Sequence, residues 1–370
     1  MTDNPLVSIV LPTHNGGHYL DQAVQSCLDQ TWSNWELVIV DDASTDDTPE
    51  RIARWAKEDP RIRSARHFRN RRLPAALNTG FARASGEYLT WTSDDNVYRP
   101  HALAEMASFL EAHDDVDVVY ADYSEIDHQG QVLRRLRVSP MEELAVQNCV
   151  GPCFLYRRRV QEQLGGYAED LFLAEDYDFW LRASEFFRLE RLPVDCYLYR
   201  VHAGSLTARR AREIETARAQ AQFRNLARLR WMGAPTKAYA YTTLGLRLCR
   251  TDQAYLGRFY LRRAFGECDI LDHDAEFVVR ELLYERPGVL RAASDISALI
   301  EALPMDLRGV RALIKRVWGR YHQVCCFEGY REKRPDVIRR HLPHAVWLAP
   351  AGLANRGFVR IGLWGYTHRG

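Results

Sequence analysis

Three short polar clusters follow apolar, strand-like runs in the first hundred residues. The clusters are "PTHN" at 12–15, "DDAS" at 41–44 and "SDDN" at 93–96. Ligands of α/β sheets bind outside the carboxyl ends of the strands, where such clusters would meet. Asp, Asn and Ser also favour turns and helix caps, so one cluster alone fits a simple turn. Three clusters at equivalent strand ends instead indicate one shared, acidic crevice.

The adjacent carboxylates of Asp94 and Asp95 repel each other unless a positive group lies near them. Carboxylate oxygens suit Mg²⁺ or Mn²⁺, and Mg²⁺ is typically held by one or two carboxylates plus the phosphates of a substrate. No Gly-x-Gly-x-x-Gly and no Gly-x-x-x-x-Gly-Lys-[Ser/Thr] motif follows the first strand-like run. This counts against a dinucleotide dehydrogenase and a Walker-type phosphate loop. We therefore expect Mn²⁺ or Mg²⁺ together with a diphosphate.

Strand and helix patterns alternate through the first two hundred residues. Continuous apolar runs at 7–12 and 36–42 are typical of strands buried on both faces. Residues 116–127 form another strand-like run, and residues 101–113 have the apolar spacing of a helix. This alternation predicts an α/β domain with a mostly parallel sheet and flanking helices.

Three longer segments occur in the order typical of a known family. They are "VSIVLPTHNGGHYLDQAVQSCLDQTWSNWELVIVDDASTDDT", "ALNTGFARASGEYLTWTSDDN" and "GGYAEDLFLAEDYDFWLRA". Together they resemble family 2 glycosyltransferases over residues 5–207. The segment "TSDDNVYRP" is also similar to that of the family's spore-coat polysaccharide enzyme. The resemblance implies the GT-A fold, a Rossmann-like, mostly parallel mixed sheet with flanking helices. It also implies inverting transfer of a sugar from a nucleotide-diphosphate donor.

The resemblance assigns roles on the donor side. Positions that match nucleotide or donor contacts are Pro12, Thr13, His14, Asn15, Asp42, Asn78, Ser93 and Asp94. Asp42 is expected to contact the base, and Asn78 is expected beside the donor. Asp94 and Asp95 match the family's Asp-x-Asp element, with Asp95 on the metal. This chain reads Ser-Asp-Asp at that element, which departs from Asp-x-Asp, so the nucleotide contact falls to Ser93 or Asp94.

An inverting transfer needs a base that deprotonates the attacking hydroxyl. Glu175, Asp176 and Asp178 lie at the start of a helix-like pattern, where acids also favour the helix dipole. The resemblance places the base at Asp176 with Glu175 as its neighbour, and neighbouring charge would raise its pKa. His202, in "YRVHAGSLT", resembles the family's histidine that reaches the metal or the diphosphate. A lone histidine is as often a packing residue.

Charge separates the two halves of the chain. Residues 1–200 hold 21 Lys and Arg against 33 Asp and Glu, a net charge of −12, and residues 201–370 hold 29 against 16, a net charge of +13. Strand signals nearly vanish after residue 207. We therefore expect a catalytic domain at 1–207 and a mainly helical domain at 208–370 that contacts the acceptor, a partner or a membrane surface. Helix-on-helix packing, which we slightly favour, explains the same basic and aromatic residues.

Targeting signals are not evident in the sequence. Eight cysteines without a Cys-x-x-Cys pair indicate buried free thiols in a reducing cytoplasm. The N-terminus lacks the pattern of a signal peptide, and no apolar run reaches the roughly 18 residues of a spanning helix. We expect a cytoplasmic protein, or one peripheral at the inner face of the membrane.

The favoured function is an inverting glycosyltransferase that uses a nucleotide sugar, preferably a UDP-sugar. Its acceptor would be a glycan, lipid-linked or other hydroxyl in surface polysaccharide or glycoconjugate synthesis. A sugar nucleotidyltransferase is one alternative, although "PTHNGGHYLD" lacks the Lys or Arg of a phosphate loop. A catalytically inactive sugar-nucleotide-binding or scaffold protein is another. Specific nucleic-acid binding is not expected, because no recognised motif accompanies the basic half.

Overall fold

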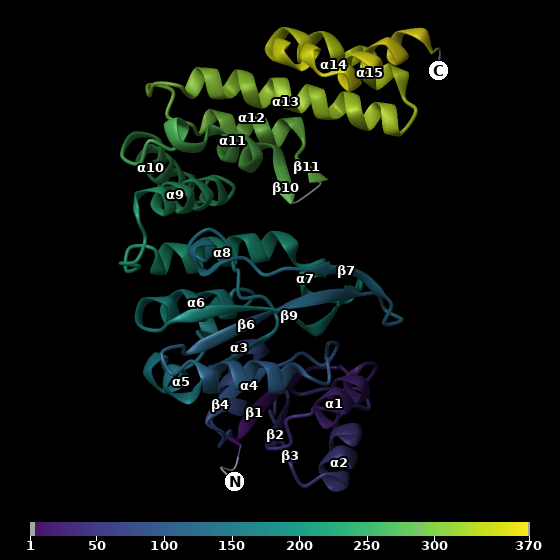
Figure 1. Cartoon of the computed structure of the whole chain (residues 1–370), viewed down its shortest axis with the longest axis vertical. Helices are drawn as coiled ribbons and strands as arrows, with labels where there is room; N and C mark the ends of the chain where they lie inside the picture. Colours follow the sequence, from purple (N-terminus) through teal and green to yellow (C-terminus); the bar gives the residue numbers. More distant parts are fainter. Residues whose placement is uncertain (1–3, 287–288, 369–370) are drawn as a thin grey trace. The chain divides into compact units, whose positions relative to one another are not determined.

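The first part of the chain folds around one mixed sheet. The structure, a computed structural model, describes residues 4–286 and 289–368. In these ranges the chain forms two compact units that divide after Met232, and the sheet of the first unit has nine strands (Figure 1). The strand order is β3-β2-β1-β4-β8-β6-β9-β5, and β7 pairs with β6. The strands are β1 (Val7–Thr13), β2 (Trp35–Asp41), β3 (Ile62–Arg66), β4 (Tyr88–Trp91), β5 (Val97–Tyr98), β6 (Val118–Ile126), β7 (Val132–Leu136), β8 (Phe154–Arg157) and β9 (Leu189–Arg200).

Strands β3, β2, β1 and β4 run parallel to one another, and β8 joins β4 in the antiparallel direction. The register pairs Thr13 of β1 with Asp41 of β2, and it pairs Val10 with Trp91 at the end of β4. The carboxyl ends of these strands therefore meet at one edge of the sheet, where the polar clusters begin. This arrangement confirms the predicted sheet.

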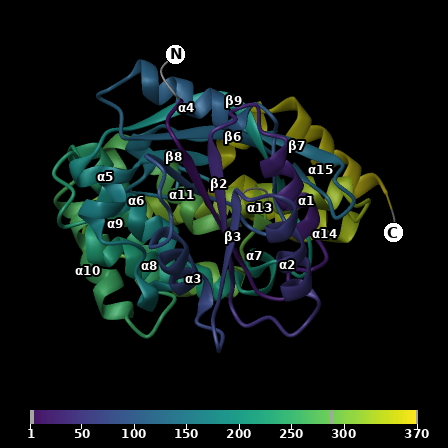
Figure 2. The ribbon, with the colours of Figure 1, turned by 90° about the horizontal axis from the view of Figure 1, so that it is seen from below.

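Helices cover both faces of the parallel strands. Ile9 belongs to a core cluster with Leu20 of α1, whereas Val38 on the alternate face of β2 packs with Ala76 of α3. Figure 2 shows α1 and α2 on one side of β2 and β3 and α3 on the other side. The helices of this unit are α1 (Leu20–Leu28), α2 (Thr48–Glu58), α3 (Arg72–Phe81), α4 (Ala102–Ala112), α5 (Arg158–Leu164), α6 (Glu175–Phe186), α7 (Leu206–Arg209) and α8 (Ala211–Asn225), with short 3-10 turns at Met141–Glu143 and Glu169–Leu171.

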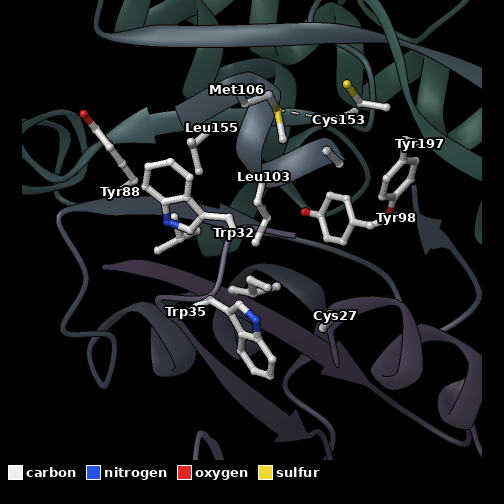
Figure 3. Packing of buried hydrophobic residues seen from close by; sticks show 14 of the residues in the cluster. Cys27, Trp32, Trp35, Tyr88, Tyr98, Leu103, Met106, Cys153, Leu155 and Tyr197 are labelled. Carbon is white, nitrogen blue, oxygen red and sulfur yellow. Dashed lines mark hydrogen bonds between the residues drawn. The ribbon is translucent and has the colours of Figure 1, made fainter. Parts of the chain in front are cut away.

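Aromatic and sulfur-containing side chains fill the core between the sheet, α1 and α4 (Figure 3). Tyr98 of β5 and Tyr197 of β9 meet edge to face, with ring centroids 5.0 Å apart. Cys153 Sγ lies 3.9 Å from Met106 Sδ of α4. The edge-to-face contact between Tyr98 and Tyr197 adds to the free energy gained by burial. The core thus joins segments that lie far apart in the sequence.

Helix α8 belongs to the first unit, although the sequence analysis placed the domain boundary at 207. Asn225 Nδ2 donates to Oδ1 of the buried Asp178 at 2.8 Å, and Gln222 Nε2 donates to the carbonyl oxygen of Ala145 at 2.7 Å. The helix also packs against α6. Because these contacts satisfy buried polar groups of the sheet domain, the first unit continues to Met232.

The second unit, from Gly233 onward, is mainly helical as expected. Its helices are α9 (Ala234–Leu248), α10 (Ala254–Gly266), α11 (Ile270–Leu283), α12 (Ala293–Glu301), α13 (Val310–Arg331), α14 (Pro335–Leu348) and α15 (Arg356–Thr367), with a 3-10 turn, η3, at Pro350–Ala354. A short antiparallel hairpin of β10 (Tyr284–Arg286) and β11 (Val289–Leu290) was not predicted. Helix α13 packs along α14, and α9 packs along α10. None of the helices in the described ranges has the length and apolar character needed to cross a bilayer.

Shortened chains test the end of the first unit. We expect residues 1–232 to unfold cooperatively in urea. Residues 1–207 should lose about 3 kcal/mol or more of unfolding free energy, because the buried Asp178 loses Asn225 and the apolar surface under α8 becomes exposed. Circular dichroism in urea measures both fragments. Equal stability of the two fragments would contradict the assignment of α8 to this unit.

Candidate active site

Thr13, the last residue of β1, joins the first polar cluster to the third. It follows the buried Pro12, and its Oγ1 donates to Asp94 Oδ2 at 2.5 Å. Gly16 makes room for this contact, because a Cβ there would lie 1.9 Å from Asp94 Oδ2. Burial, and then the charge of Asp95, raises the pKa of Asp94 to about 7. The parallel register thus brings two predicted donor-side residues into direct contact.

The loops after β1 and β2 are tied together by His14 and Asn15. His14 Nδ1 lies 2.8 Å from the carbonyl oxygen of Asp42. Asn15 has a φ of 57°, a left-handed conformation that asparagine tolerates better than most residues. Its N–H donates to Ser44 Oγ at 2.9 Å, and its Oδ1 accepts from the N–H of Thr45 at 2.8 Å. Both predicted residues therefore shape the edge of the sheet.

Asp42, the residue expected at the nucleotide base, has its carboxylate held by protein groups. Oδ1 accepts from the N–H of Arg71 at 2.8 Å, and Oδ2 accepts from the N–H of Arg72 at 2.7 Å. His67 Nδ1 lies 2.7 Å from the same Oδ1, and Asp42 is 4% exposed. These contacts fix the loop after β3 against β2. Contact with a base stays a prediction.

Asn78 on α3 positions the segment that leads into α6. Its Oδ1 accepts from the N–H of Tyr167 at 2.8 Å, and its Nδ2 donates to the carbonyl oxygen of Tyr167 at 2.9 Å. Gly166 has a φ of +92°, and a Cβ there would lie 2.6 Å from Asn78 Oδ1. Ser93 is partly exposed next to Asp94. Donor contacts of Asn78 and Ser93 stay predictions.

Asp95 and His202 form a mixed oxygen and nitrogen pair. His202 Nε2 lies 3.0 Å from Asp95 Oδ2, and each side chain is 21% exposed. Tyr19 meets the His202 ring edge to face, with centroids 5.4 Å apart. In the part of the chain that the structure describes, no cluster of three or more His, Cys, Asp or Glu is arranged to hold a metal. Asp95 and His202 supply two ligand atoms, so their role on Mn²⁺ or Mg²⁺ together with diphosphate oxygens stays a prediction.

Two adjacent acids begin helix α6. Leu173, at a φ of 80°, donates its N–H to Glu175 Oε2 at 2.7 Å. Asp176 Oδ2 accepts from Asn148 Nδ2 at 2.9 Å, and its Oδ1 accepts from the N–H of Tyr177 at 2.7 Å. The N-terminus of a helix also favours negative charge. The structure thus gives Asp176 two hydrogen-bond donors in fixed positions.

Burial raises the pKa of both Glu175 and Asp176. For Glu175, burial and then the charge of Asp176 raise the pKa to about 8. For Asp176, the hydrogen bond from the N–H of Tyr177, the charge of Arg218 on α8 and the hydrogen bond from Asn148 oppose the rise that burial causes. The two neighbouring carboxyls therefore titrate as a pair, and both are weaker acids than solvated carboxyls.

Tyr199 of β9 is partly buried. Burial raises the pKa of its phenol, and the charges of Asp95, Glu125 and Asp176 add to that rise. Trp91 Nε1 also donates to Tyr167 Oη at 3.0 Å, which joins the end of β4 to the segment before α6.

Asn148, Tyr199 and Arg200 shape the site, and sequence reasoning missed all three. Arg200 is 2% exposed; its Nε donates to the carbonyl oxygen of Asp95 at 2.9 Å, and its guanidinium lies 4.4 Å from the ring centroid of Tyr19. A charged residue in the apolar run "CYLYRVH" is the signal that marks Arg200. Asn148 and Tyr199 carry no comparable signal.

A cavity of about 610 Å³ lies beside α1 and β5, away from the predicted residues. Its lining includes Asp21, Trp55 and Pro100, and none of the predicted site residues belongs to it. Asp21 is already paired with Arg51 and Arg54. The acidic edge of the sheet, rather than this cavity, is therefore the candidate site.

Comparison with known families and proteins gives matches to the first part of the chain. Residues 8–165 match the family described as "Glycosyl transferase family 2". The putative glycosyltransferase EpsE of Bacillus subtilis is 30% identical over 191 residues, which cover 50% of this chain and 69% of EpsE. The O-antigen biosynthesis protein RfbC of Myxococcus xanthus is 31% identical over 194 residues, 50% of this chain and 15% of RfbC. A glycosyltransferase of Rickettsia felis is 32% identical over 189 residues, and the chain spans only 31% of its length.

Two solved structures share the fold. TarS of S. aureus is 17% identical with a TM-score of 0.52, covering 83% of this chain and 50% of TarS. The mannosyltransferase PcManGT of Pyrobaculum calidifontis, solved in complex with GDP-Man and Mn²⁺, is 23% identical with a TM-score of 0.52, covering 81% of this chain and 86% of PcManGT. At these identities the likeness concerns the fold. It confirms a GT-A-like sheet with flanking helices followed by a helical region.

The raised pKa of Glu175 predicts a pH-dependent loss of stability. Glu175 keeps its proton up to about pH 8 in the folded chain, whereas the unfolded chain releases it near the ordinary value of 4.5. Because the folded state binds more protons in this window, the free energy of unfolding should fall as pH rises from about 4.5 to about 8. Glu175→Gln removes the titration, so between pH 5 and pH 8 it should gain about 2 kcal/mol relative to the unmodified chain.

Urea unfolding at both pH values measures this gain. The control is Glu162→Gln on α5, which replaces an exposed glutamate and should show no such gain. A difference between Glu175→Gln and the unmodified chain that does not change with pH would contradict the raised pKa.

Proposed function

The chain belongs to glycosyl transferase family 2, and on this premise we propose that it moves a sugar from a nucleotide-diphosphate donor to an acceptor hydroxyl with inversion at the anomeric carbon. Membership in this family makes the chain a glycosyltransferase. It overturns the alternative of a sugar nucleotidyltransferase. Because the chain spans only part of several relatives, its donor, acceptor and partners are part of the proposal.

The placement of Asp176 is the observation that carries the proposal. At the start of α6, beside the buried Glu175, Asp176 accepts hydrogen bonds from Asn148 Nδ2 and from the N–H of Tyr177. In the transfer, the Asp176 carboxylate takes the proton from the acceptor hydroxyl as its oxygen attacks the anomeric carbon. The bond from that carbon to the donor diphosphate breaks in the same step. A raised pKa makes Asp176 a stronger base than a solvated aspartate.

Asp95 and His202 would hold the divalent cation, Mn²⁺ or Mg²⁺. When bound, such a cation offsets the charge on the departing diphosphate. PcManGT, of the same fold, is described in complex with a nucleotide sugar and Mn²⁺, which supports pairing the two here. Thr13 and Asp94 fix the adjacent edge, and the Thr13 hydroxyl keeps Asp94 in one position.

We propose a UDP-sugar as donor and surface polysaccharide or glycoconjugate synthesis as the process. RfbC is named as an O-antigen biosynthesis protein, which supports a surface glycan as product. The acceptor would then be a glycan, lipid-linked or other hydroxyl. We propose the cytoplasm, including the inner face of the membrane, as the place of transfer.

Asp176→Asn separates chemistry from binding. The variant should release nucleoside diphosphate from UDP-glucose, UDP-N-acetylglucosamine or GDP-mannose, with water as acceptor, about 100-fold more slowly than the unmodified chain. Donor affinity, measured by isothermal titration, should stay unchanged, because the amide keeps the shape of the carboxylate and can still accept one of its two hydrogen bonds. Glu162→Gln is the control. Unchanged turnover in Asp176→Asn would remove this residue as the base. An unmodified chain that binds a donor without turning it over would support the inactive scaffold instead.

Asp95→Ala tests the cation pair. We expect donor affinity in the presence of Mn²⁺ to fall about tenfold or more, because the carboxylate ligand is lost. Asp114→Ala, at a side chain that is 99% exposed, serves as the control. Isothermal titration with and without Mn²⁺ measures both variants. Donor binding by the unmodified chain that does not depend on a divalent cation would rule out this role.

A further inference from the structure

Helix α15 exposes an apolar stripe in the second unit. Val359, Leu363 and Tyr366 follow one another at intervals of four and three residues, so they lie on one face of the helix. They are 38%, 65% and 58% exposed. The opposite face holds Phe358 and Ile361, which are buried in a core cluster with residues of α13 and α14. The stripe is therefore not needed for packing of the described residues.

Two arginines of α15 lie beside this stripe, because Arg356 and Arg360 are exposed within three residues of Val359. On α14, which packs against α15 (Figure 1), Arg339 and Arg340 are exposed as well. No ion pair with an acid is found for any of these four within residues 4–286 and 289–368. The sequence explains this, because no Asp or Glu follows Asp336. The surface thus combines uncompensated positive charge with exposed apolar side chains.

We propose that the exposed face of α15 docks the chain on an anionic lipid surface. An amphipathic helix lies in the interface with its apolar residues at the acyl boundary and its cations at the headgroup phosphates. Two more large apolar side chains of this region are exposed, Trp347 near the end of α14 at 77% and Leu353 of η3 at 50%. The 12 residues of α15 are too few to span a bilayer, so the contact is peripheral.

A second copy of the chain fits this face less well. In a two-fold interface the same patch meets itself, so Arg356 and Arg360 of two copies would lie close together. Like charges placed opposite one another oppose such an interface. Anionic headgroups supply the charge that the segment after Asp336 lacks. The proposal does not depend on the transfer reaction, because no residue of the candidate active site belongs to this face.

Vesicle sedimentation with the full chain tests the proposal. The unmodified chain should sediment with vesicles of phosphatidylcholine and phosphatidylglycerol and stay in solution with vesicles of phosphatidylcholine alone. Leu363→Ser combined with Tyr366→Ser, and separately Arg356→Gln combined with Arg360→Gln, should each lower the partition coefficient about tenfold or more. Tyr255→Ser is the matched control, because Tyr255 on α10 is 71% exposed and lies outside the face. It should bind as the unmodified chain does.

Three results would overturn the proposal. One is an unmodified chain that stays in solution with anionic vesicles, and another is full binding by both double variants. The third is a dimer, seen by analytical ultracentrifugation, that dissociates when Leu363 and Tyr366 are replaced, since that would assign the face to a second copy. Circular dichroism of each variant shows whether it is folded, which separates lost docking from lost folding. The double variant Arg356→Gln and Arg360→Gln changes no apolar side chain and is the milder of the two. Donor binding should be the same in all of them.

Discussion

Negative charge concentrated at one edge of the sheet is the constraint on which the first unit depends. Partly or fully buried carboxylates at strand ends and at a helix start repel one another and lose hydration. The structure compensates each of them with a different group. Backbone N–H groups hold Asp42, a hydroxyl contacts Asp94, an imidazole contacts Asp95 and an amide contacts Asp176. Those contacts fix the conformations of the loops at this edge of the sheet.

The type of compensating group separates structural acids from chemical ones. Asp42 accepts from two backbone N–H groups, which cannot move without the loop, so its carboxylate is fixed. Asp95 is paired with His202, a side chain that can ligate a cation instead of contacting the carboxylate. Asp176 has donors that stabilise its charge, while burial raises the pKa of the neighbouring Glu175. One acidic edge can therefore hold a cation and a base at the same time.

Much of this edge could be predicted from the sequence, because buried parallel strands and their polar ends leave a local pattern. The clusters at Thr13 and Asp94 follow from that pattern, and parallel pairing then brings them together. The contacts of Asn148 with Asp176 and of Asn225 with Asp178 could not be predicted, because they join residues far apart in the chain. Helix α8 resembles the helices of the second unit in sequence. Its buried polar contacts, which also join residues far apart in the chain, assign it to the first unit. The β10 and β11 hairpin is too short to leave a period-2 signal.

The acidic edge of the sheet should bind a nucleoside diphosphate together with a divalent cation. Thermal unfolding of the full chain with UDP, GDP or dTDP, each with and without Mn²⁺, tests it most directly. A ligand at one hundred times its dissociation constant adds about 2.7 kcal/mol to the free energy of unfolding. We predict a rise in melting temperature for one nucleotide, seen only when Mn²⁺ is present. The absence of any rise, or an equal rise without Mn²⁺, would contradict the account.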